Sequence, residues 1–160
     1  MRSGRTVLLT IALTLTAAAP AFADIVAFIG PNTTPSARMA KGIGIGASFV
    51  VAGFELEYSA TGDDPANNAP ALKTGMANAF LQSPVPFLGF QPYATVGAGI
   101  FKETLGAHDE TGTAMNIGGG VKYTLTGPLQ LRADYRVFKL GSGALNTPAH
   151  RLYIGLNVKF

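Results

Sequence analysis

The sequence contains no cysteine, and charged residues make up only 13% of its 160 residues. Without cysteine, both a disulfide framework and a cysteine-linked lipid anchor are excluded, so stability must come from backbone pairing and packing. The sequence is 48% hydrophobic, yet beyond residue 23 it has no apolar run long enough to span a bilayer as a helix. High apolarity without long apolar runs requires another arrangement of the hydrophobic residues.

The N-terminal segment MRSGRTVLLTIALTLTAAAPAFA has the layout of a secretory signal peptide. Arg2 and Arg5 precede an apolar run over residues 7–19, and small residues follow at Ala21 and Ala23. The run is too short to favour a membrane anchor, so residues 1–23 are predicted to be cleaved, leaving one domain over residues 24–160. Without the two signal arginines, that domain has ten basic and nine acidic residues, which leaves no basic patch for nucleic acid.

Hydrophobic residues alternate with a period of two through most of the predicted domain, and no helical period competes with this pattern. The alternation predicts eight strands, most of the length that a tilted strand needs to cross a membrane. Their approximate ranges are 24–30, 40–49, 53–61, 73–82, 91–101, 113–124, 129–139 and 151–160.

Long and short connections alternate along the chain. The long ones are polar and cover residues 31–38, 62–72, 103–112 and 141–150, whereas the short ones cover 50–52, 83–90 and 125–128. In an up-and-down sheet, alternate connections lie at the same end. Long loops at one end and tight turns at the other are typical of transmembrane barrels. The fold prediction is therefore an all-β, eight-stranded antiparallel up-and-down transmembrane β-barrel.

Charged residues and many glycines share the strand faces opposite the apolar ones. We predict that these charges face the lumen and pair there, because buried charges must be paired. Two interpretations follow: a gated polar pathway whose Glu–Arg pairs switch partners, or a structural network that keeps the lumen closed, which the sequence favours. The predicted lumen charges are Glu55, Glu57, Lys122, Arg132, Asp134, Arg136, Arg151 and Lys159.

The final stretch RLYIGLNVKF resembles the C-terminal signature of bacterial outer-membrane proteins, an alternating strand that ends on an aromatic residue. Its alternate apolar residues are Leu152, Ile154, Leu156, Val158 and Phe160. The segments QPYATVGAGIF, TAMNIGGGVKYT and LQLRADYR are also similar to the family of small eight-stranded barrels that includes the OmpA transmembrane domain and OmpX.

The resemblance implies a monomer in the bacterial outer membrane, in contact with outer-membrane lipids and lipopolysaccharide. It also implies that the barrel-assembly machinery reads the last strand, which closes the barrel against the first strand. The sequence departs from the OmpA pattern after this strand, so no periplasmic peptidoglycan-binding domain is expected.

The sequence offers little material for catalysis. A lipid A hydrolase would need a serine and a histidine oriented by an acid. The two histidines, His108 and His150, lie in predicted loops, and no acid is placed to orient His150 beside Ser142. We predict no catalytic residue, no metal and no cofactor, and a structural or surface-interaction role. The alternatives are a small solute pore, a lipid-modifying enzyme, or a soluble barrel with its apolar faces turned inward around a ligand.

Overall fold

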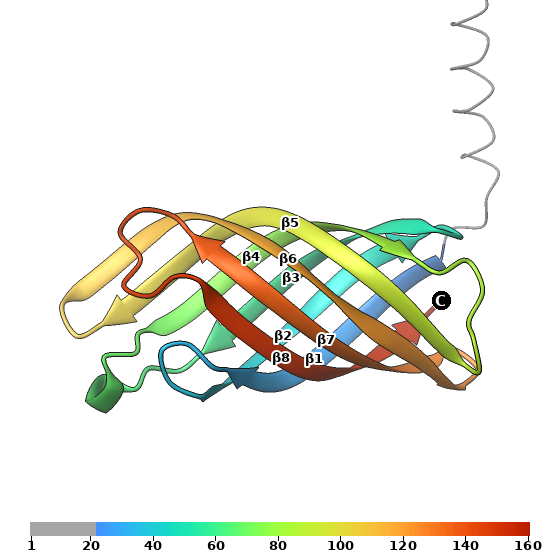
Figure 1. Cartoon of the computed structure of the whole chain (residues 1–160), viewed down its shortest axis with the longest axis horizontal. Helices are drawn as coiled ribbons and strands as arrows, with labels where there is room; N and C mark the ends of the chain where they lie inside the picture. Colours follow the sequence, from blue (N-terminus) through green and yellow to red (C-terminus); the bar gives the residue numbers. More distant parts are fainter. Residues whose placement is uncertain (1–21) are drawn as a thin grey trace, which may run out of the picture.

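The computed structural model describes residues 22–160, which form a closed eight-stranded barrel (Figure 1). Each strand pairs antiparallel with its neighbour in sequence, and β8 closes the barrel against β1. The predicted fold is confirmed. The strands are β1 (Phe22–Asn32), β2 (Arg38–Ser48), β3 (Ala52–Thr61), β4 (Ala71–Gln82), β5 (Phe90–Leu105), β6 (His108–Thr126), β7 (Leu129–Leu140) and β8 (Ala149–Lys159). No helix in this part of the chain is long and apolar enough to cross a membrane.

The pairing register tilts the strands and fixes the width of the barrel. A line of paired residues that starts at Phe22 of β1 can be followed around the barrel to Arg151 of β8. Arg151 pairs with Asn32, which lies ten residues beyond the starting point in β1. This stagger accompanies strong strand tilt, and eight strands leave an interior that side chains can fill.

Along the strands, outward apolar residues alternate with inward residues that are largely polar or charged. In β7, Leu131 and Tyr135 are exposed, whereas Arg132, Asp134 and Arg136 are at most 2% exposed. Closure pairs the backbone of every strand, so this apolar exterior can lie in lipid without unsatisfied peptide groups. The orientation is the reverse of what a soluble ligand-binding barrel requires.

The predicted third long loop is mostly strand, which corrects the sequence interpretation. β5 and β6 continue their pairing through Glu103–Glu110, Thr104–Asp109 and Leu105–His108, leaving only residues 106–107 as the turn. Gly106 has φ of +57°, which a tight hairpin turn requires. The glycines and polar residues of this segment are typical of a loop. Here they pair as two strands joined by a two-residue turn, and the hairpin projects beyond its neighbours.

The opposite end carries the short turns and the C-terminus (Figure 1). Its longest link covers residues 83–89 and is closed by a bridge between Phe87 and Phe90. The predicted signal peptide lies outside the described residues except for Phe22 and Ala23, which begin β1. Its cleavage stays a prediction.

Candidate functional site: a filled and charge-paired lumen

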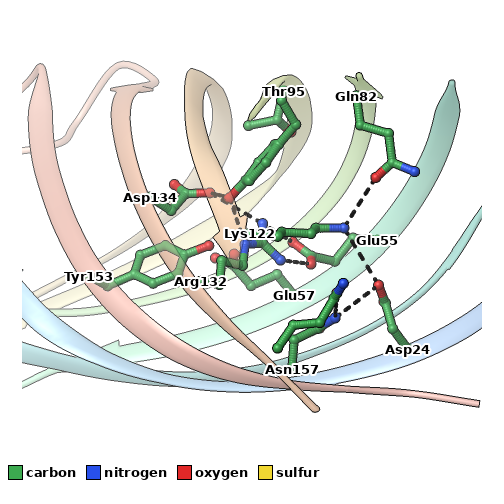
Figure 2. Close-up of polar contacts among 12 residues, drawn as sticks. Asp24, Glu55, Glu57, Gln82, Thr95, Lys122, Arg132, Asp134, Tyr153 and Asn157 are labelled. Carbon is green, nitrogen blue, oxygen red and sulfur yellow. Dashed lines mark hydrogen bonds and ion pairs between the residues drawn. The ribbon is translucent and has the colours of Figure 1, made fainter. Parts of the chain in front are cut away.

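Two strands on opposite sides of the barrel supply most of the lumen charges. β3 turns Glu55 and Glu57 inward, and β7 turns Arg132, Asp134 and Arg136 inward, because positions two apart on a strand share a face. With Arg151 of β8 they form what we call the central network, and all six side chains are at most 4% exposed. Figure 2 shows Glu55, Glu57, Arg132 and Asp134 of this network.

Arg136 is the most completely enclosed member of the central network. It is 0% exposed, and its guanidinium donates to Glu57 at 2.9 Å, to Glu55 at 3.1 Å and to Asp134 at 3.0 Å. A further N–H donates to the Tyr153 hydroxyl at 3.1 Å. Charge-assisted bonds of this kind are stronger than neutral ones. Arg136 therefore joins β3, β7 and β8 across the lumen.

Arg132 forms the second centre of the central network. Two of its nitrogens donate to the Glu55 carboxylate, and a third donates to the Tyr93 hydroxyl at 2.6 Å. Tyr93 in turn donates to Asp134, which also accepts from Arg132 at 3.2 Å. Every charge here has at least two partners, as burial in a low dielectric demands.

Arg151 carries the central network towards the loop end of the barrel. It donates to Glu57 and, at 2.7 Å, to the Ser59 hydroxyl. Its guanidinium also lies 4.9 Å from the ring centre of Phe28 and 4.6 Å from that of Phe138. Aromatic rings at these distances stabilise a desolvated cation.

Lys122 and Asp24 form a second layer nearer the end that carries the short turns. Lys122 Nζ lies 3.7 Å from Asp24 and donates to Gln82 at 3.4 Å, while Asn157 donates to Asp24 at 3.4 Å (Figure 2). Nζ also sits 4.6 Å from the centre of the Phe80 ring. The sequence interpretation missed Asp24, because the other inward positions of β1 include the apolar Val26 and Phe28.

Lys159, the last of the predicted lumen charges, lies at the mouth of the lumen and is not part of the paired set. It makes no ion pair among residues 22–160 and instead lies half-buried at the rim, 4.9 Å from the centre of the Phe22 ring. The parity of β8 does turn it inward, but it is the last residue of that strand. The other seven predicted charges are brought together with Asp24, so four basic and four acidic side chains balance.

An apolar plug fills the lumen on the loop side of the central network. Its buried members are Leu72, Met76, Phe101, Ala114, Phe138, Leu140 and Ala149. Between this plug and Arg151 a void of only about 10 Å³ remains, at the lower limit for a single water molecule. At the mouth on the short-turn side, a cavity of about 240 Å³ is lined by Gln82, Gln91 and Gln130 among others. The lumen is thus closed by an apolar layer and by a charged one.

The loops at the outer end contact one another above this plug. Arg38 donates to the carbonyl oxygens of Gly62 at 2.9 Å and of Thr34 at 3.0 Å. Asp64 accepts from Ser36 at 3.0 Å, and the bonds from Asn67 and Ser36 hold the pKa of the Asp64 carboxyl below its usual value. These contacts join the β1–β2 and β3–β4 loops into one cap.

Glu103 anchors the β7–β8 loop from the projecting part of the β5–β6 hairpin. Its carboxylate accepts the Leu145 backbone N–H at 2.9 Å, and the side chain is 1% exposed. Burial raises the pKa of Glu103 above its ordinary value of 4.5, while the hydrogen bond from Leu145 and then the interactions with His108 and Arg38 act against the rise and Glu110 adds to it.

We expect Glu103 to make stability fall as pH rises. Because the folded carboxyl holds its proton to higher pH than the unfolded one, the contribution of Glu103 is complete below pH 4.5 and is lost as pH rises through the raised pKa. Glu103→Gln keeps the acceptor for Leu145, so it should unfold at a higher temperature than the wild type at pH 7.5 and lose this part of the pH dependence. Thermal unfolding in detergent from pH 4 to 8 measures both, and parallel curves for the two proteins would refute the assignment.

The residues considered for catalysis are not assembled into a site. His150 Nδ1 lies 2.7 Å from the Tyr135 hydroxyl on the outer wall, and Ser142 is exposed in the β7–β8 loop. His108 lies at the start of β6, at the tip of the projecting hairpin. Within residues 22–160 no group of three His, Cys, Asp or Glu side chains could hold a metal ion.

A closed barrel with an apolar exterior and a paired, charged interior defines a class, the integral β-barrels of bacterial outer membranes. The chain belongs to the family of the outer membrane protein beta-barrel domain, whose family model matches residues 37–160. It is accordingly a protein of the bacterial outer membrane. No curated protein matches the sequence.

Solved structures with the same fold include barrels of different roles. The N-terminal β-barrel domain of Pseudomonas aeruginosa OprF superposes with a TM-score of 0.69 at 19% identity, covering 87% of this chain and 97% of that one. Neisserial surface protein A gives 0.60 at 19% identity, with 88% and 96% covered. The outer membrane enzyme PagL gives 0.53 at 10% identity, with 84% and 98% covered. At these identities the likeness concerns the fold alone.

Proposed function

We propose that this protein is a non-catalytic, non-conducting barrel that presents its joined outer loops at the bacterial surface. The observation that carries the proposal is the balanced interior, where four basic and four acidic side chains are paired across the lumen. An ion crossing it would have to break several buried pairs, each costly to open. The function then lies on the outside of the barrel and in its loops.

Conductance in planar bilayers tests the closed lumen. We expect the wild-type protein to give no stable channels in 1 M salt, a condition chosen to amplify any small current. An opened control has to remove both closing layers, so it combines Arg132→Ala and Arg136→Ala with Phe101→Ala and Phe138→Ala in the apolar plug. Regular wild-type channels as large as those of this control would establish the small solute pore instead.

Incubation with lipid A tests the absence of catalysis. We expect mass spectrometry to recover the lipid with all its acyl chains, because the His150 ring is hydrogen-bonded to Tyr135 and to no acid among residues 22–160, and Ser142 lies in an exposed loop. Loss of an acyl chain that disappears in the His150→Ala variant would instead support a lipid-modifying enzyme.

The last strand is proposed to be the segment that the barrel-assembly machinery binds. Leu152, Ile154, Leu156, Val158 and Phe160 are all exposed on the lipid side, and Phe160 exchanges backbone hydrogen bonds with Ala23 at 2.8 and 3.0 Å. We expect Phe160→Ala to reduce the amount of barrel inserted in cells while leaving refolding in detergent unchanged. Equal loss in both assays would assign Phe160 to stability alone.

A further inference from the structure

The end of the barrel that carries the short turns has an apolar, uncharged rim. Its three links cover residues 49–51, 83–89 and 127–128, and none of them contains a charged residue. In these links Val50, Phe87 and Leu88 are between 51% and 78% exposed. Exposed apolar residues that gather in one region mark a surface that another molecule covers.

Part of this rim surrounds the opening of the lumen. Phe49, Val50, Pro84 and Pro86 line the cavity of about 240 Å³ at this end, which we call the mouth cavity, together with glutamines that face the lumen. The lipid that surrounds the outer wall therefore does not cover this part of the rim. The two prolines restrict the backbone of the longest link, so ordering it on binding costs little entropy.

Three carboxamides form the polar lining of the mouth cavity. Gln82, Gln91 and Gln130 are between 5% and 8% exposed, and the Nε2 atom of each donates one hydrogen bond of 2.8–3.2 Å to the chain around the mouth. A carboxamide carries two N–H groups. Each glutamine therefore keeps a second donor for which residues 22–160 supply no acceptor. Because buried polar groups are normally hydrogen-bonded, these donors favour a ligand that is rich in acceptors.

Lys159 gives the mouth cavity its charge. It is the one charged side chain among the described residues that line the cavity, and it makes no ion pair within residues 22–160. Its cross-strand neighbour Asp24 pairs with Lys122 instead. The predicted cleavage after Ala23 would also remove Phe22, whose ring centre lies 4.9 Å from Lys159 Nζ, and would so uncover the ammonium group. An anion at the mouth would meet a cation that has no other partner there.

The size and charge of the mouth cavity limit what can bind in it. Pockets for drug-sized molecules usually hold roughly 300–1,000 Å³, whereas about 240 Å³ accommodates a side chain or the end of a chain. One ammonium group balances the single negative charge of a carboxylate, but not the charge of about −1.5 to −2 on a phosphate monoester. The exposed apolar rim offers contact area that a small free anion could not use. These features together favour a carboxylate on an apolar peptide.

We propose that the mouth cavity binds a carboxylate group carried by an apolar peptide segment of a periplasmic protein. Lys159 and the free N–H groups of the three glutamines hold the carboxylate through charge-assisted hydrogen bonds. The apolar residues of the segment pack against Phe49, Val50 and Pro86. Short turns face the periplasm in barrels of this class, so the partner approaches from that side. The site lies at the opposite end from the outer loops and adds a second binding surface to the proposed function.

Retention of peptide pools by the immobilised protein in phosphatidylcholine nanodiscs tests the site, with empty nanodiscs as the background. All pools are short peptides of randomised apolar residues with a blocked N-terminus. One pool has a free C-terminal carboxylate, one has a C-terminal amide, and one has the amide and a single glutamate. We expect the uncharged amide pool to be retained roughly ten- to a hundredfold less than the better carboxylate pool, the usual contribution of a hydrogen bond to a charged group. Comparison of the two carboxylate pools shows whether the group is a chain end or a side chain.

Substitutions locate the binding in the mouth cavity. Lys159→Gln should lower retention of the carboxylate pools to the level of the amide pool, and Lys159→Arg should preserve it. Lys139→Gln is the matched control, because it removes the same charge from the exposed outer face of β7 and should change nothing. Gln91→Leu removes one carboxamide of the lining and should also weaken retention.

Equal retention of the amide and carboxylate pools, or unchanged retention by Lys159→Gln, would overturn the proposal. Lys159→Gln is expected to fold, because Lys159 makes no ion pair within residues 22–160. Native mass spectrometry of the same proteins examines a lipid as the occupant. If phosphatidylglycerol binds the wild type and is lost from Lys159→Gln while no peptide is retained, the mouth cavity holds a lipid headgroup and the peptide proposal is wrong. Conductance and lipid A assays do not depend on this site, so its failure leaves the proposed function untouched.

Discussion

Arg136→Ala is expected to lower the free energy of unfolding by about 3–5 kcal/mol, the usual cost of removing one partner from a buried ionic cluster. Most of this loss of stability comes from the carboxylates that stay buried without their cation. Glu55, Glu57 and Asp134 all accept hydrogen bonds from Arg136, and all three stay buried when it is removed. Three carboxylates would then share the two remaining arginines of the central network.

Urea unfolding in lipid vesicles, followed by the gel mobility of unboiled samples, measures this effect. Lys159→Ala is the matched control, because it also removes an inward cation but one that lies half-buried at the rim without an ion pair among residues 22–160. Its expected change is within about 0.5 kcal/mol, as for other surface substitutions. Equal midpoints for Arg136→Ala and the wild type would show that the central network does not stabilise the barrel.

The number and order of the strands could be predicted from the sequence because the lipid-facing exterior and the charged interior of the barrel require very different residues. Because lipid lies outside the barrel and paired charges lie inside, apolar and polar residues alternate along the strands with a period of two. The alternation is clearest in β7, over Leu131, Arg132, Ala133 and Asp134. Alternating loop lengths then place the ends. The same alternation predicted eight lumen charges, of which the structure buries seven among their ion-pair partners and places Lys159 half-buried at the mouth.

The remainder depended on information that is not local. Phe101 and Phe138 point inward and form part of the plug, so the inner face is not uniformly polar. The type of a single residue therefore does not show whether it faces the lumen or the lipid. Asp24 was missed because its ion-pair partner is not local: it pairs with Lys122 of β6, a contact that exists only once the barrel has closed. Lys159, its neighbour in the β1–β8 ladder, also faces inward at the mouth of the lumen but makes no ion pair among residues 22–160. The extension of β5 and β6 was not predicted because strands whose residues are polar on both faces lack the apolar alternation and have the composition of a loop.

A substitution at an interior glycine is also expected to change the free energy of unfolding strongly, because these glycines leave room for the side chains and backbone of the neighbouring strands. A Cβ atom on Gly120 of β6 would lie 2.8 Å from the Tyr93 hydroxyl and 3.0 Å from Cα of Asp134, and it would overlap the carbonyl oxygen of Ala133. Two of these three atoms are backbone and cannot move aside. The third is the hydroxyl that joins Arg132 to Asp134, so any shift also disturbs the central network.

Gly120→Ala is therefore expected to cost about 3 kcal/mol, the upper end of the usual range for overpacking. Gly75→Ala is the matched control in β4, since its Cβ would point outward and meet only Ile100 Cγ1 at 3.8 Å. There the change should stabilise the strand by about 0.5–1 kcal/mol, because alanine loses less backbone entropy than glycine on folding. The two substitutions add the same methyl group, so opposite signs in vesicle unfolding would isolate the crowding of the lumen. Equal effects of the two changes would mean that the lumen is looser than the paired charges imply.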